Sequence, residues 1–285
     1  MNVNEQQDAR LRIAAIDFLN PAPLMWDFEH PPQNQELALH YSLERMTPSE
    51  CAQRLSTGEA DLGLVPIAAL ATSSQFHVLP GCAIASKGHI RSLLLVRRAN
   101  QPLEAIRTVA ADTASRTTVT YARMLFRLWG NPQARFLPQA VDLDRMLASA
   151  DAAVVIGDPA LYARQDIAAR LARTGEELIY YDMAEEWRAQ TGLPYISAVW
   201  CTAQDCASVE DIAQDCIRSR DHGLEHIDDL VDEWAPRMNL PTATVRDYLS
   251  NNLHYVLDQE CIDGVKGFFR TAAEMDILPR YEFPL

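Results

Sequence analysis

The feature that most constrains the fold of this chain is a short apolar run that ends at two prolines, within the segment RIAAIDFLNPAPLMW. Residues 12–18 are mostly small or apolar and lie between polar segments, which predicts a buried strand. Pro21 and Pro23 have no backbone N–H to donate to a sheet, so we expect Asn20 in a rigid turn at the carboxyl end of the strand. Ligands bind at such strand ends in open α/β sheets. Asn20 is therefore either a ligand contact or a residue whose side chain closes its own turn.

Strand and helix signals alternate along most of the remaining chain. Thr47, Pro48 and Glu50 predict the start of a helix, because they supply an N-cap, an N1 proline and an acid at N3. The other expected strands are 37–43, 60–65, two runs within 78–97, 107–110, 134–137 and 152–156. The expected helices are 48–56, 119–129, 143–148, 208–232, 242–257 and 259–275.

This alternation predicts an α/β fold with two lobes. Asn100-Gln101-Pro102 is interpreted as a lobe boundary, after which the alternation restarts. Lobe 1 is expected to contain residues 1–98 and 199–285, and lobe 2 the inserted residues 99–198. A cleft between two such lobes suits a small ligand.

Composition and charge narrow the class of partner. The chain has 285 residues, 48% of them hydrophobic, and a net charge of −14. This charge argues against nucleic acid and anionic membrane surfaces, which require a basic surface, but it leaves room for a local site that binds a small anion. The start of the chain is polar, no apolar run suits a signal peptide or a membrane span, and the six cysteines form no C-x-x-C pair. We therefore expect a cytoplasmic protein with a small anionic partner, and the sequence leaves the oligomeric state open.

The motifs of several enzyme classes are absent. The sequence contains no G-x-G-x-x-G, G-x-x-x-x-G-K-[ST], G-x-S-x-G or H-E-x-x-H motif. It does contain H-x-x-E-H, the spacing of inverted zinc proteases, at His222, Glu225 and His226. Gly223 and the neighbouring aspartates favour a solvated stretch of acidic helix instead. We therefore expect neither a metal nor a cofactor.

Hydroxyl side chains gather before the expected helix at 119–129. Ser115, Thr117 and Thr118 lie where free backbone N–H groups and the helix dipole favour a carboxylate or a phosphate. A single Ser or Thr would suffice for an ordinary N-cap, so the density of hydroxyls favours a ligand.

Further candidates lie at three other expected turns. Ser86, Arg91 and Ser92 surround a glycine-containing bend, and Arg91 is either a bidentate carboxylate ligand or a surface charge. Asp158, in the segment IGDPA, is either a helix cap, the more common role, or a ligand contact. Tyr195 either lines an aromatic-accepting pocket or fills the core between the lobes, and core filling is the more common role.

Seven stretches, in order, carry a resemblance to a known family: FLNPAPLMW, GEADLGLVPIAAL, ASKGHIRSLLL, DTASRTTVTYARMLF, VVIGDPALY, EEWRAQTGLPYISAVW and NLHYVLDQECIDGVKGFFRTAAEMDILP. They are similar to segments of the chorismate dehydratases, which begin the futalosine route to menaquinone, and they cover nearly the whole chain. The resemblance implies the two-lobed periplasmic-binding-protein-like type II fold with an interlobe cleft. It also implies the elimination of water from chorismate to give 3-[(1-carboxyvinyl)oxy]benzoate.

The resemblance also implies roles for individual residues. The family's turn asparagine falls on Asn20, its anion loop on Ser115, Thr117 and Thr118, and its bend residues on Ser86, Arg91 and Ser92. One departure is Gly88-His89, where the family usually has Gly-Pro.

The expected loops offer few candidates for a general base. They contain no histidine or carboxylate other than His89, Asp112 and Asp158, so the substrate's own enolpyruvyl carboxylate is a candidate base. The alternative function is a cytoplasmic small-carboxylate-binding protein of the same fold without catalysis. The sister enzyme that makes 1,4-dihydroxy-6-naphthoate is disfavoured because its motifs are missing.

Overall fold

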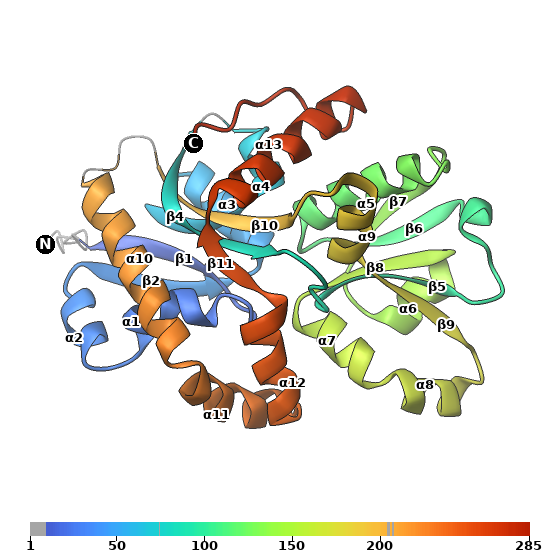
Figure 1. The fold of residues 1–285 in the computed structure, drawn as a ribbon, viewed down its shortest axis with the longest axis horizontal. Helices are drawn as coiled ribbons and strands as arrows, with labels where there is room; N and C mark the ends of the chain where they lie inside the picture. The colour runs from blue at the N-terminus through green and yellow to red at the C-terminus, as the bar shows by residue number, and fades with distance from the viewer. Residues whose placement is uncertain (1–9, 74, 204–205, 207) are drawn as a thin grey trace, which may run out of the picture.

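The protein has two lobes, each built around one β-sheet (Figure 1). The structure is a computed structural model that describes residues 10–73, 75–203, 206 and 208–285. Residues 1–9, which the sequence assigned to lobe 1, lie outside these ranges. Within the described ranges, no helix is long and apolar enough to cross a membrane.

The first sheet has the strand order β11-β4-β10-β3-β1-β2. Its strands are β1 (Leu11–Ile16), β2 (Tyr41–Met46), β3 (Leu62–Pro66), β4 (Phe76–Ser86), β10 (Tyr195–Ala203) and β11 (His254–Leu257). The helical segments that accompany it are η1 (Ala22–Met25), α1 (Trp26–Glu29), α2 (Gln33–Leu37), α3 (Pro48–Ser56), α4 (Ile67–Leu70), α10 (Val209–Glu225), α11 (Ile227–Met238), α12 (Thr242–Asp247), the π-helical turn η3 (Tyr248–Asn252) and α13 (Gln259–Glu274). β1 pairs in parallel with both β2 and β3, whereas β10 runs antiparallel to β3 and β4.

The second sheet has the strand order β7-β6-β8-β5-β9. Its strands are β5 (Leu93–Arg98), β6 (Thr108–Asp112), β7 (Arg135–Gln139), β8 (Ala152–Ile156) and β9 (Leu178–Asp182). Its helices are η2 (Leu103–Ala105), α5 (Arg116–Leu128), α6 (Leu143–Ser149), α7 (Asp158–Gln165), α8 (Ile167–Thr174) and α9 (Met183–Thr191). β6 pairs in parallel with both β7 and β8, and β5 runs antiparallel to β8 and β9.

The main hydrophobic core is continuous between the two lobes. Successive residues of β5 point to opposite faces of the second sheet, so Leu93 and Leu95 join the main core while Leu94 and Val96 pack in a smaller cluster on the other face. Aromatic rings from lobe 2 and lobe 1 meet in the main core, where the centroids of Tyr121 and Tyr195 are 3.9 Å apart.

The structure confirms the expected α/β architecture and the helix at 48–56, including its capping box at Thr47. Other expected elements are wrong. The expected strand at 37–43 begins only at Tyr41, because residues 33–37 form α2. The expected helix at 208–232 is interrupted at His226. The expected helix at 242–257 is helical only to Asn252, as α12 and then η3, and residues 254–257 form β11, an edge strand paired with β4.

The expected lobe boundaries also need correction. β5 (93–98) was assigned to lobe 1, yet it pairs with β8 and β9 of the second sheet. The first half of β10 was assigned to lobe 2, yet Tyr195 pairs with Ser86 in the first sheet. The chain therefore leaves the first sheet after Ser86, at the bend that the sequence indicated. The turn at Asn100-Gln101-Pro102 lies within lobe 2, between β5 and β6 of the second sheet. Turn residues occur at any reversal of the chain and not only at a domain boundary.

Candidate functional site

The carboxyl ends of parallel strands from both sheets meet between the lobes. β1 and β3 are neighbours in the first sheet, and β6 and β8 are neighbours in the second. Two hydrogen bonds join the segments that follow these strands: the Leu19 N–H donates to Asp158 Oδ1 at 3.0 Å, and the Ala68 N–H donates to the Thr117 hydroxyl oxygen at 3.1 Å. We call this line of contacts, from Leu19–Asp158 to Ala68–Thr117, the interlobe seam.

Gly157 allows the two lobes to approach closely at one end of the seam. Its φ is +65°, a backbone conformation that favours glycine, and a Cβ placed on it would lie 2.8 Å from the Phe18 ring. Its N–H donates to the Ser92 carbonyl oxygen at 2.7 Å. This glycine follows β8 and lets α7 begin directly against the turn that carries Asn20.

Asn20 lies at the seam with an unused hydrogen-bond acceptor. Its Oδ1 is buried, and no described residue donates a hydrogen bond to it. The side chain therefore does not close its own turn through this oxygen. Backbone bonds close the turn instead, from Ala22 N–H to Leu19 O and from Leu24 N–H to Pro21 O. A buried acceptor without a partner is costly, so its presence here favours a ligand.

The start of α5 supplies the hydroxyls that the sequence predicted. Ser115 is the N-cap and accepts a hydrogen bond from the Thr118 N–H, so the N-cap role applies to one of the three residues. The Thr118 hydroxyl also contacts the Ser115 hydroxyl and the Tyr195 hydroxyl, each at 3.0 Å. The Thr117 hydroxyl accepts from Ala68, and no acceptor for its proton occurs in the described part of the chain. Thr117 can therefore donate a hydrogen bond to an anion in the seam.

The bend after β4 places its three candidates differently. The Ser86 hydroxyl is nearly fully buried and bonds with Gly88, and Ser86 lies opposite Tyr195 in the sheet. Arg91 Nη2 lies 3.3 Å from an Asp247 carboxylate oxygen, so its charge is partly neutralised within the chain. Ser92 is buried and accepts a hydrogen bond from the Tyr248 hydroxyl at 2.8 Å, which ties it into the core.

Asp158 does not cap α7, so the more common of the two roles considered for it is wrong. The N-cap is Gly157, and Asp158 is the first helical residue, bonded to Leu19 of the other lobe. Desolvation by burial raises the pKa of the Asp158 carboxyl to about 6, against the opposing effect of the Leu19 N–H. A carboxyl group that is perturbed in this way and lies between lobes is a candidate functional group.

Tyr195 is fully buried, and its ring stacks on Tyr121. The expected core-filling role is therefore confirmed. Its hydroxyl donates to Thr118 and so helps to fix the start of α5.

Two cavities lie near the start of α5. One, of about 320 Å³, is lined by residues that include Ala68, Asp112, Ser115, Arg116 and Arg123. The second, of about 460 Å³, shares Thr72 and Arg116 with the first. Asn20 and Ser86 line neither cavity. Sequence reasoning missed Arg116 and Arg123, and the signal available was their spacing of seven residues, which places both on one face of a helix.

The H-x-x-E-H residues do not gather around a common centre. His222 Nδ1 lies 2.8 Å from a carboxylate oxygen of the buried Asp27, whereas the His226 ring stacks on Trp26 with its Nδ1 2.8 Å from Asp229. The expected solvated stretch is confirmed for Glu225 and His226, which are exposed, but not for Gly223, which is buried where α10 packs against the backbone of Pro23.

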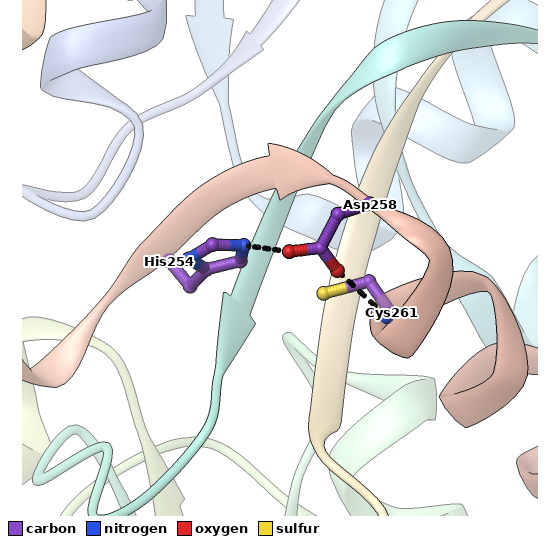
Figure 2. Close-up of side chains that lie close together, drawn as sticks. All are labelled: His254, Asp258 and Cys261. Carbon is purple, nitrogen blue, oxygen red and sulfur yellow. Dashed lines mark hydrogen bonds and ion pairs between the residues drawn. The ribbon is translucent and has the colours of Figure 1, made fainter.

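A second group with metal-ligand chemistry lies at the start of α13. His254, Asp258 and Cys261 place one ligand atom each within 4.8 Å of one another (Figure 2). Asp258 already has partners, because it caps α13 through the Cys261 N–H and its Oδ2 lies 2.6 Å from Lys87 Nζ. Burial raises the pKa of the Cys261 thiol to about 12, so the thiol is protonated at neutral pH. Asp258 is thus the N-cap of α13 and forms ion pairs with Lys87, which follows Ser86, and with His254.

Comparisons with known proteins give both a family and a fold. The sequence model of a family described as menaquinone biosynthesis matches residues 11–274. A chorismate dehydratase from Thermus thermophilus is 25% identical over 237 residues, which are 78% of this chain and 83% of that protein.

The similar solved structures share the fold at low sequence identity. A protein from Archaeoglobus fulgidus has a TM-score of 0.72 and 13% identity, with 95% of this chain and 100% of that chain covered. The alkanesulfonate-binding protein SsuA from Xanthomonas axonopodis, bound to MOPS, has a TM-score of 0.65 and 15% identity, with 95% and 94% covered. A Candida albicans protein described as having the generic periplasmic-binding-protein fold has a TM-score of 0.64 and 14% identity, with 96% and 92% covered. These likenesses confirm the expected periplasmic-binding-protein-like fold.

Proposed function

Because this chain belongs to the menaquinone biosynthesis family, we propose that it is a chorismate dehydratase, which converts chorismate into 3-[(1-carboxyvinyl)oxy]benzoate and water. The observation that carries the proposal is the unpartnered, buried Oδ1 of Asn20 at the interlobe seam. The likeness to a chorismate dehydratase supports the choice of substrate. A biosynthetic role of this kind agrees with the cytoplasmic location expected from the sequence.

The reaction requires the loss of a proton and a hydroxyl from adjacent ring carbons. The C3–H bond breaks and its electron pair forms the C3=C4 bond, while the C4–O bond breaks and its pair leaves on oxygen. The C3 proton is vinylogous to the ring carboxylate, so negative charge develops toward that carboxylate as the proton leaves. Hydrogen-bond donors fixed near the carboxylate lower the barrier, because they are oriented before the charge develops.

The residues of the seam supply such donors. We propose that Ser115, Thr117 and Thr118 hold one substrate carboxylate, which is supported by the free proton of Thr117 and by the exposed N–H groups expected at a helix start. Ser86 and Arg91 contact the other carboxylate, which requires Arg91 to exchange Asp247, and the Ser86 hydroxyl to exchange the Gly88 carbonyl, for the substrate. Ser92 and Tyr195 support these residues from the core, where Ser92 accepts from the Tyr248 hydroxyl and Tyr195 donates to Thr118.

Asn20 is assigned to the C3/C4 end of the ring, and the enolpyruvyl carboxylate of the substrate serves as the base. In this arrangement the protein contributes mainly by positioning, which by itself accounts for a large part of a barrier reduction. The base is then a group of the substrate itself.

The test is to mix the purified protein with chorismate and to follow the loss of the diene absorbance together with the formation of product. We expect one product molecule for each chorismate consumed, without an added metal or cofactor. Saturable binding of chorismate with unchanged absorbance would contradict the proposal and would favour a binding protein of the same fold.

A further inference from the structure

Asp158 is held at the seam by one of its two carboxyl oxygens. β8 is apolar and buried, and its end at Gly157 places Asp158 against the turn of lobe 1. Oδ1 accepts the Leu19 N–H at 3.0 Å, and no donor to Oδ2 occurs among the described residues. No described lysine, arginine or histidine forms an ion pair with Asp158 either. When Asp158 is neutral, its proton is therefore on Oδ2. The residue to which Asp158 is bonded, Leu19, directly precedes Asn20.

The charges around Asp158 oppose one another. The titratable and charged groups that interact with it are Asp17, Arg45, Tyr162, Arg237 and Tyr248. Arg45 and Arg237 favour the carboxylate form, but Arg45 is itself 2.7 Å from Glu29. Asp17 disfavours the carboxylate form, as burial does more strongly. Burial prevails and raises the pKa of Asp158 to about 6, so its neutral acid is populated near neutral pH.

One step of the elimination, protonation of the leaving C4 oxygen, has no residue assigned to it so far. Hydroxide is a poor leaving group, so the C4 oxygen needs a proton as its bond to carbon breaks. The seam residues assigned above donate hydrogen bonds but do not give up protons readily, because the pKa values of hydroxyl and amide groups are far above 7. A carboxylic acid near the C3/C4 end would meet this need.

We propose that Asp158 is the general acid of this reaction, an inference that rests on the proposed function. The enolpyruvyl carboxylate takes the C3 proton, and the electron pair of the C3–H bond forms C3=C4. The pair of the C4–O bond leaves on oxygen, which takes the proton of Asp158 Oδ2 and departs as water. The proton taken from C3 is released to solvent, and Asp158 regains a proton from solvent before the next turnover. No oxidant or reductant is needed.

A purely structural role for Asp158 makes a different prediction. If Asp158 only held the two lobes together, it would act by accepting a hydrogen bond from the Leu19 N–H, and an asparagine side-chain oxygen can accept the same bond. Asp158→Asn keeps this acceptor and the side-chain size but removes the acidic proton. Asp166→Asn is the matched control, because Asp166 lies at the other end of α7 and contacts Arg173 instead of lobe 1.

The experiment measures kcat and KM for chorismate from pH 5 to pH 9 in the wild-type protein and both variants. We expect wild-type kcat to fall above about pH 6, approaching tenfold per pH unit, because only the protonated acid is active. Asp158→Asn should lower kcat by about 10²-fold or more and remove this decline, with little change in KM. Asp166→Asn should match the wild type.

Two results would overturn the inference while leaving the proposed function intact. The first is an Asp158→Asn profile with the wild-type kcat and the same decline. The second is a wild-type kcat that stays flat from pH 5 to pH 8, which decides the question even if the variant does not fold. If the wild type fails to convert chorismate at any pH, the proposed function fails, and the role of Asp158 fails with it.

Discussion

Replacing Asn20 with alanine is expected to lower kcat for chorismate by about 10²- to 10³-fold, the range found when one preorganised hydrogen-bonding group at a reacting centre is removed. The side chain is half-buried at the seam, and its Oδ1 has no partner among the described residues. The backbone bonds that close the turn do not involve this side chain, so the fold should remain intact. The measurement is steady-state kinetics, with circular dichroism to check the fold.

Asn34→Ala is the matched control for this prediction. Asn34 also has a buried Oδ1 without a described partner, but it lies in α2 and its amide bonds to the Glu29 carbonyl. We expect this variant to change stability without changing kcat. An Asn20→Ala protein that retains kcat within about twofold of the wild type would show that Asn20 takes no part in the reaction, because even a single neutral hydrogen bond contributes about this much.

Gly223→Ala is expected to lower the free energy of unfolding by about 3 kcal/mol, the upper part of the range for overpacking a rigid site. A Cβ on Gly223 would lie 2.7 Å from the Cα of Pro23, and backbone atoms cannot move aside as a flexible side chain can. Ser219, one turn earlier in α10, donates to the Leu24 carbonyl at 3.0 Å. This face of α10 therefore holds the turn that presents Asn20.

Thermal unfolding measures the effect, and we expect the Tm to fall by about 6 °C or more. Gly88→Ala is the matched control, because its added Cβ would meet no atom within 4 Å. Equal Tm values for Gly223→Ala and Gly88→Ala would contradict the proposed packing. Reduced kcat in the folded fraction of Gly223→Ala would further support the link between α10 and the turn at Asn20.

Local signals in the sequence were sufficient for several parts of the fold. Two prolines were enough to predict where the first strand ends, since proline cannot continue a ladder. Thr47 with Glu50 was enough to predict a helix start, because capping depends on residues close in sequence. The helix expected at 119–129 begins earlier, at Arg116, so Thr117 and Thr118 lie in its first turn and not before it.

The errors occurred where distant parts of the chain decide the structure. Residues 254–257 are a strand because β4 offers an edge to pair with, and strand formation depends strongly on such neighbours. The hydrogen bond between Leu19 and Asp158 joins residues 139 positions apart, so no local pattern indicated it, and the local IGDPA pattern favoured capping instead. The burial of Gly223 likewise depends on a turn two hundred residues earlier.

The most direct test of the central claim is a crystal structure of the wild-type protein with the unreactive product, 3-[(1-carboxyvinyl)oxy]benzoate. The claim is that the two lobes close over a small molecule with two carboxylates, which hydroxyl and amide groups bind at the seam. We predict one carboxylate within about 3.2 Å of the Thr117 hydroxyl and the ether end of the ring beside Asn20. Product bound away from the seam, or contacting only one lobe, would contradict this account.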